Sequence, residues 1–222
     1  MDSIWTKTFT IRKRASLKGD IRADVAVIGG GMTGILTAWQ LKQAGVRAVV
    51  LEAERIGGGQ TGNTTAKVTS QHGMFCHTFI GNKGEETARK YVQANQAAVE
   101  EYKRIIRERG ISCDLRECDS YVYSADGDIL AKEVEAAKKL GVDVVLENQI
   151  SLPVSCAGTV CFHGQAEFHP LKFIGALAEE LEIYEETPVK EVEEHLVKTP
   201  GGSVRADKIV FAVHFPFINF PG

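Results

Sequence analysis

The pattern of hydrophobic and polar positions near the start of the chain predicts two buried strands joined by a helix. Residues 24–28 and 47–51 are short, almost continuous apolar runs, typical of strands that are covered on both faces. Residues 33–44, between them, are predicted to be helical. The order strand, helix, strand is the βαβ unit, which predicts an α/β fold with a parallel sheet.

The same reading predicts further elements along the chain. Apolar positions three and four residues apart indicate a long amphipathic helix that ends near Gly110. Asp128 is expected to cap another helix that ends at Gly141, and Pro170 to open a third. Further strands are expected at residues 121–123, 142–146, 189–192 and 209–213 and near Ile183, with a hairpin turn at 199–202 and a polar arm before residue 20.

A glycine motif joins the first predicted strand to its helix. Gly29, Gly31 and Gly34 form the pattern G-x-G-x-x-G directly after the apolar run. Each glycine has a physical role: Gly29 permits a tight turn, Gly31 lets the backbone approach a pyrophosphate, and Gly34 lets helix and strand pack closely. The motif in this position predicts dinucleotide binding.

The helix start and an acid complete the predicted binding unit. The N–H groups at Met32 and Thr33, together with the helix dipole, favour phosphate. Glu52 follows the second strand, about 20 residues beyond the glycines, where an acid accepts hydrogen bonds from the adenosine ribose. The motif does not separate FAD from NAD, but Glu52 argues against a cofactor with a 2′-phosphate.

A long loop after Glu52 favours FAD over NAD, because a nicotinamide-binding domain usually has a short loop there. Residues 53–73, rich in glycine and threonine, resemble the FAD-dependent oxidoreductases of the D-amino-acid oxidase and glycine oxidase superfamily, and especially a bacterial branch that often carries a C-terminal Rieske domain. Residues 187–192 and 206–214 resemble two later strands of that family. The resemblance implies FAD as cofactor, held by Gly29, Gly31, Met32, Thr33, Gly34, Glu52, Ala53, Arg55, Thr61, Gly62, Asn63, Thr64, Thr65, the backbone of Val189 at the adenine, and Ala212 beneath the cofactor.

The resemblance also implies an architecture. It predicts a Rossmann-like FAD-binding domain of the GR2 type with part of a mixed α+β substrate lobe. Residues 1–111 and 151–222 are expected to form the FAD-binding domain, and 112–150 the first part of the substrate lobe or a small β-α-β lobe on the main sheet. The family continues into a second flavin-binding segment, so we expect the sequence to be a truncated, N-terminal part.

The function implied by the resemblance is oxidation of an amine or amino acid by hydride transfer to flavin. The partner is then a small molecule, and this part alone is expected to have little activity. Two other functions stay open at this point: an NAD-binding Rossmann module, and a catalytically dead remnant that self-associates. No catalytic residue is identified, although Lys67, His72, His77 and His214 could each face a flavin ring.

The net charge and the cysteine count bear on the partners, metal sites and location that can be expected. The formal net charge is −3, which gives no reason to expect nucleic acid or a membrane as a partner. The chain has five cysteines and no C-x-x-C pair. An odd number of cysteines fits a reducing compartment, so free thiols, a cytoplasmic location and no metal site are predicted.

An apolar run lies near the end of the sequence, at residues 209–220. Exposed apolar surface of that kind marks a contact region. The run therefore predicts a homo-oligomer, with Phe215, Phe217 and Phe220 at or near the contact.

Overall fold

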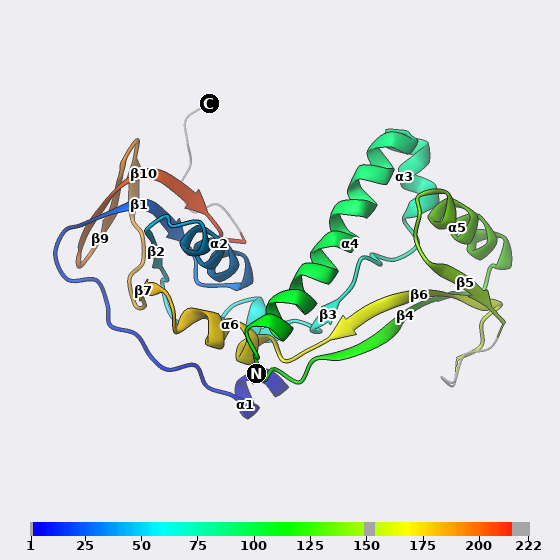
Figure 1. Cartoon of the computed structure of the whole chain (residues 1–222), viewed down its shortest axis with the longest axis horizontal. Helices are drawn as coiled ribbons and strands as arrows, with labels where there is room; N and C mark the ends of the chain where they lie inside the picture. The colour runs from blue at the N-terminus through cyan, green and yellow to red at the C-terminus, as the bar shows by residue number, and fades with distance from the viewer. Residues whose placement is uncertain (1, 149–153, 215–222) are drawn as a thin grey trace. The chain divides into compact units, whose positions relative to one another are not determined.

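The computed structural model describes residues 2–148 and 154–214 and has the expected α/β character. The chain forms two compact units, whose elements are labelled in Figure 1. Unit 1 comprises Met1–Thr65 and His169–Gly222, and unit 2 comprises Ala66–Phe168. These borders differ from the expected domain borders near residues 111 and 151, because the long amphipathic helix packs within unit 2. The assignment of cofactor and substrate domains stays a prediction.

Unit 1 is built on a six-stranded sheet in the order β7-β2-β1-β10-β9-β8. Strands β7, β2, β1 and β10 run parallel to one another, as the βαβ pattern predicts. Strands β9 and β8 continue the sheet with antiparallel pairing. Val27 and Val50 pair at its centre and are fully buried, which explains the continuous apolar runs. The strands are β1 (Ile21–Ile28), β2 (Ala48–Leu51), β7 (Glu182–Tyr184), β8 (Glu191–Glu193), β9 (Leu196–Thr199) and β10 (Gly202–Phe211).

Helices α2 and α6 of unit 1 follow the predicted signals, whereas α1 lies in the stretch that was expected to be a polar arm. Helix α2 begins at the G-x-G-x-x-G motif, residues 29–34, which is called the glycine turn from here on. The helix lies against β1 and β2 and also packs on α6 (Figure 1). Helix α6 begins as predicted, because the His169 side chain accepts a hydrogen bond from the N–H of Lys172 and Pro170 occupies the first turn. The bounds are α1 (Ile4–Thr8), α2 (Met32–Gln43), α6 (Pro170–Ala178) and a 3₁₀ turn, η1 (Thr61–Asn63).

Unit 2 combines a small antiparallel sheet with three helices. The sheet has the order β3-β6-β4, and β5 also pairs with β6. Figure 1 shows α3, α4 and α5 on one side of this sheet. Val160 and Phe162 of β6 belong to the buried cluster that these helices cover. The bounds are β3 (Lys67–Val68), α3 (Cys76–Lys83), α4 (Glu85–Glu108), β4 (Arg116–Ser124), α5 (Gly127–Lys139), β5 (Val144–Glu147) and β6 (Gly158–Glu167).

Three further details differ from the sequence-based expectations. The cap of α5 is Asp126, whose carboxylate accepts from the N–H groups of Asp128 and Ile129, and Asp128 is already in the first turn. Strand β6 was not expected, because Gly164 interrupts its apolar pattern. The short helix α3 was not expected either, because its capping group comes from another helix.

That capping group is Glu133 of α5, which is almost fully buried. Its two carboxylate oxygens accept hydrogen bonds from the backbone N–H groups of Cys76 (2.8 Å) and His77 (3.0 Å) at the start of α3. A carboxylate is favourable there because it meets both the unpaired N–H groups and the helix dipole. Burial and the adjacent carboxylate raise the pKa of the Cys76 thiol, which therefore stays protonated.

Glu133→Ala is expected to lower the free energy of unfolding by about 2–3 kcal/mol, because two buried N–H groups lose a charged acceptor. Urea denaturation followed by circular dichroism measures the loss. Glu135→Ala, an exposed position on the same helix, is the matched control and should change stability by less than about 0.5 kcal/mol. Equal stability of the two variants would contradict the assigned capping role.

Two observations bear on the setting of the chain. None of the helices within residues 2–148 and 154–214 is long and apolar enough to cross a membrane. The expected contact residues Phe215, Phe217 and Phe220 lie outside the described residues, so self-association through them stays a prediction.

Candidate cofactor-binding site

The glycine turn sits where β1 ends, between β2 and β10. The N–H of Gly29 donates to the carbonyl of Leu51 (2.9 Å), and the N–H of Ala212 donates to the carbonyl of Ile28 (2.8 Å). Gly29 has φ +111°, and a Cβ there would lie 2.6 Å from the carbonyl oxygen of Ala212. Gly29 and Ala212, each predicted to bind the cofactor, are therefore brought together, and only glycine fits at the turn.

Gly34 makes the closest approach in the motif. A Cβ at this position would lie 1.9 Å from the carbonyl oxygen of Gly29. No side chain can be accommodated at that distance, so the first turn of α2 packs directly on the end of β1 only because residue 34 is glycine. The packing role predicted for Gly34 agrees with this geometry.

The N-terminus of α2 presents backbone N–H groups of the kind that bind anions. Gly31 is the N-cap and provides no capping side chain, and the nearest atom to a Cβ built on it is Thr61 Oγ1, at 3.4 Å. The N–H of Met32 donates to Thr61 Oγ1 (2.9 Å). The N–H groups of Thr33 and Gly34 have no acceptor within the part of the chain that the structure describes. Backbone donors of this kind at a helix start fit a pyrophosphate.

Glu52 is held at the glycine turn. Its Oε2 accepts from the N–H of Gly30 (2.6 Å) and its Oε1 from the N–H of Glu54 (2.8 Å). The carboxylate is therefore fixed beside the motif at the end of β2, where a ribose with two hydroxyl groups would need an acceptor. Gly30 had not been singled out from the sequence, although its place inside the motif is the signal for it.

Val189 lies near the same strand ends. The N–H of Thr187 donates to the carbonyl of Glu52 (2.9 Å), which brings the following segment beside the acid. Val189 itself is buried in the cluster that contains Ile28 and Leu51, just before β8 rather than within a strand. Its backbone N–H and carbonyl have no partner within the described residues, so they are available for the adenine contact, which stays a prediction.

The long loop is anchored by the N-terminal arm. The Trp5 indole donates to the carbonyl of Thr64 (2.7 Å), and the Ser3 hydroxyl donates to the carbonyl of Gly62. The side chain of Asn63 donates to the carbonyl of Gly59 (2.9 Å) within the loop. These anchors fix the loop backbone, whereas Ala53 and Thr65 are exposed. Five of the loop positions in this paragraph were predicted to contact the cofactor, and those contacts stay predictions: Ala53, Gly62, Asn63, Thr64 and Thr65.

Arg55 is held by contacts within unit 1, and its predicted role at the cofactor stays a prediction. Its guanidinium pairs with Glu185 (3.0 Å) and donates to the carbonyl of Ile11 (2.8 Å). Glu185 is fully buried and also accepts from the N–H groups of Arg14 (2.7 Å) and Ile56 (2.8 Å). The side chain of Arg55 thus serves the internal packing of the loop. Glu185 was missed from the sequence, because nothing local marks an acid as buried.

The other residues considered for the flavin are divided between the two units. Lys67, His72 and His77 belong to unit 2, and His72 Nδ1 lies 3.0 Å from the hydroxyl of Tyr91. His214 is exposed in unit 1, three residues after β10. A role for any of them at a flavin ring stays a prediction.

Comparison with known proteins agrees with this geometry. The chain is 35% identical to the Bacillus subtilis (strain 168) protein YhfW, whose name describes a Rieske 2Fe-2S iron–sulfur protein, over 100% of this chain and 46% of that one. It is 27% identical to gamma-glutamylputrescine oxidoreductase of Escherichia coli (strain K12), over 89% of this chain and 50% of that one. The chain thus spans about half the length of these curated relatives.

The fold is also similar to that of a solved oxidase. Glycine oxidase from Geobacillus kaustophilus superposes with a TM-score of 0.64 at 19% identity, over 86% of this chain and 55% of that one. The family described as FAD dependent oxidoreductase, abbreviated DAO, matches residues 24–215. The match runs from β1 past the end of β10 and includes every predicted cofactor residue. The chain therefore belongs to the DAO family of FAD-dependent oxidoreductases.

Proposed function

We propose that this chain binds the adenosine diphosphate part of FAD and forms the cofactor-binding half of an oxidoreductase that acts on an amine or amino acid. The observation that carries the proposal is the pair of unpartnered N–H groups at the start of α2 beside the fixed carboxylate of Glu52. Family membership favours FAD over the NAD alternative. The names of the relatives, a gamma-glutamylputrescine oxidoreductase and a glycine oxidase, support the substrate class.

Each residue of the site has a defined task in this proposal. The N–H groups of Thr33 and Gly34 bind the pyrophosphate, and Gly31 leaves room for it because it has no side chain. Glu52 accepts hydrogen bonds from the ribose hydroxyl groups. Thr61 holds the start of α2 through Met32, so that the donors are oriented before the cofactor binds.

The chemistry itself belongs to the cofactor, which when bound takes a hydride from the C–N unit of the substrate. The chain contributes binding and orientation through the glycine turn and the anchored loop. The residues that contact the substrate stay unassigned. The small-molecule partner and the cytoplasmic location remain predictions.

The test of the proposal is the affinity for FAD. Glu52→Ala is expected to weaken FAD binding by about 10- to 100-fold, because a charge-assisted hydrogen bond contributes roughly 1.5–3 kcal/mol. Isothermal titration calorimetry of the chain with FAD measures it, with ADP as a second ligand that shares the proposed contacts. Thermal melting confirms that the variant is folded.

Glu54→Ala is the matched control, because Glu54 is an exposed acid two residues away that contacts Glu52 only through its backbone N–H. It should bind FAD like the parent chain. A folded Glu52→Ala variant with unchanged affinity for both FAD and ADP would refute the assignment of the site.

A further inference from the structure

Three side chains with metal-binding atoms converge on the sheet of unit 2. Asp119 comes from β4, and Cys161 and His163 come from β6. Their ligand atoms all lie within 4.8 Å of one another. Val160 and Phe162 point into the core under the helices, so Cys161 and His163, which alternate with them, lie on the opposite face. The cluster therefore lies on the face of the unit 2 sheet that is opposite the helices.

A β-bulge creates this arrangement. Cys118 pairs with Gln165 and Ser120 with Phe162, so that His163 and Gly164 together lie opposite Asp119. Gly164 has φ +72°, the left-handed conformation that glycine adopts without strain. The extra residue aims the His163 imidazole at the Asp119 carboxylate, while Tyr121 remains directly opposite Cys161.

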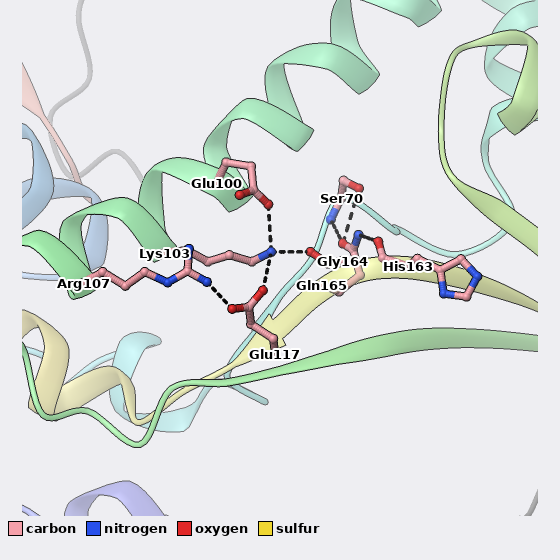
Figure 2. A network of polar contacts seen from close by, with 8 residues as sticks. All are labelled: Ser70, Glu100, Lys103, Arg107, Glu117, His163, Gly164 and Gln165. Carbon is pink, nitrogen blue, oxygen red and sulfur yellow. Dashed lines mark hydrogen bonds and ion pairs between the residues drawn. The ribbon is translucent and has the colours of Figure 1, made fainter.

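Buried polar contacts hold the bulge in place. The ammonium group of Lys103, from α4, donates to the carbonyl of Gly164 (2.6 Å), and Gln165 donates to the carbonyl of His163 (2.7 Å). Ser70 in turn donates to Gln165 (2.8 Å). Figure 2 shows this network, with the imidazole of His163 pointing away from it. The ring is thus left available while its backbone is fixed, which is the preorganisation that a ligand needs.

The distances within the cluster decide between two kinds of chemistry. His163 Nδ1 lies 3.2 Å from Asp119 Oδ2 and 3.8 Å from Cys161 Sγ. A Cys–His–Asp catalytic arrangement needs the thiol and the carboxylate on different ring nitrogens. Here the same nitrogen faces both, so the ring cannot relay a proton between them. Three ligand atoms that converge on one point are instead suited to a metal ion.

We propose that Asp119, Cys161 and His163 form a Zn²⁺ site with one position left for water. Tetrahedral Zn²⁺ separates a nitrogen and an oxygen ligand by about 3.4 Å, and a sulfur and a nitrogen ligand by about 3.6 Å, given its usual bond lengths. The observed 3.2 and 3.8 Å are close to these values, and the carboxylate oxygen and the sulfur lie within 4.8 Å of each other. One thiolate, one imidazole and one carboxylate suit Zn²⁺ better than Ca²⁺ or Mg²⁺, which prefer oxygen ligands alone.

The surroundings support a bound cation. Tyr121 pairs directly with Cys161 across β4 and β6, so its side chain is placed beside the sulfur, where outer contacts that orient metal ligands are found. Asp119 and His163 are partly exposed, with side-chain exposures of 38% and 36%, so an ion can enter from solvent. The prediction of no metal site rested on cysteine spacing, which cannot reveal ligands that meet across two strands.

The first experiment is Zn²⁺ binding by the purified chain, titrated against a chromogenic chelator. We expect one high-affinity equivalent. Asp119→Asn and His163→Gln should each weaken it at least about 100-fold, beyond the roughly 10- to 100-fold loss typical of an outer contact. Both positions are partly exposed, so the variants are expected to fold, and circular dichroism checks this.

Co²⁺ in place of Zn²⁺ tests the sulfur ligand directly. A thiolate-to-Co²⁺ charge-transfer band should appear in the parent chain, disappear in Cys161→Ser, and persist in Cys118→Ser. Cys118 is the matched control, because it lies on the same sheet with its side chain on the other face. Absence of stoichiometric Zn²⁺ binding, unchanged binding in folded Asp119→Asn and His163→Gln, or loss of the Co²⁺ band in Cys118→Ser would each overturn the proposal.

Discussion

Gly34→Ala is expected to destabilise the chain by more than about 2 kcal/mol and to abolish FAD binding. The added Cβ would lie 1.9 Å from the carbonyl oxygen of Gly29, a backbone atom that cannot move without opening the turn. Overpacking costs up to about 3 kcal/mol or more, and the gain of about 1 kcal/mol from replacing glycine in a helix does not offset it. Urea denaturation and calorimetry with FAD measure the two effects.

Gly31→Ala separates folding from binding at the same turn. Residue 31 has ordinary extended backbone angles, and its Cβ would meet only Thr61 Oγ1, at 3.4 Å. Its stability should stay within about 0.5 kcal/mol of the parent, as for substitutions away from strained features. FAD affinity should nevertheless fall, because the new methyl group occupies the path of the pyrophosphate.

Gly59→Ala is the control for both, because nothing lies within 4 Å of its Cβ position and it is exposed. It should fold and bind FAD normally. Two outcomes would contradict the division of roles: a Gly34→Ala variant as stable as Gly59→Ala, or a Gly31→Ala variant that binds FAD as tightly as Gly59→Ala does.

The glycine turn could be predicted from the sequence because its requirements are local. The same βαβ unit contains all three features: a positive φ at Gly29, a close approach at Gly34 and an acid at the end of the next strand. The contact of Thr61 with Met32 is less local, since it joins a loop to a helix start. The resemblance to a family, rather than residue spacing, drew attention to that loop.

The features that the sequence could not reveal depend on partners that are distant along the chain. Glu133 has the appearance of a surface residue of an amphipathic helix, and only the packing of α3 on α5 buries it. Strand β6 lost its alternating pattern at the bulge, where Gly164 adds a residue. The convergence of Asp119 with His163 follows from that bulge and from no motif.

The border between the two units could not be predicted from the sequence either. The strong amphipathic pattern of α4 showed that one face is buried but not against what. In the structure that face joins the buried cluster of α3, α5 and β6, through Ala88 and Val92. Periodicity identifies a buried stripe, whereas the surface that covers it is decided by the tertiary fold.

Glu185→Ala is expected to cause the largest loss of stability in unit 1, about 3–5 kcal/mol, because several donors lose one fully buried charged acceptor and each unsatisfied group costs roughly 1–3 kcal/mol. The fully buried carboxylate pairs with Arg55 and accepts from the N–H groups of Arg14 and Ile56. Without it, two backbone donors and a guanidinium lose their acceptor. The N-terminal arm and the start of the long loop lose their common anchor.

The matched control is Glu179→Ala, which removes an exposed acid that pairs with Arg12 and Arg14 of the same arm. Exposed pairs contribute less than about 1 kcal/mol, so this variant should stay close to the parent in urea denaturation. FAD affinity gives a second readout. The N–H of Gly57, next to Ile56, donates to the carbonyl of Gly30 (3.0 Å), so loosening this segment disturbs the glycine turn. If Glu185→Ala matched Glu179→Ala in both stability and FAD affinity, the buried carboxylate would not be the anchor that its contacts indicate.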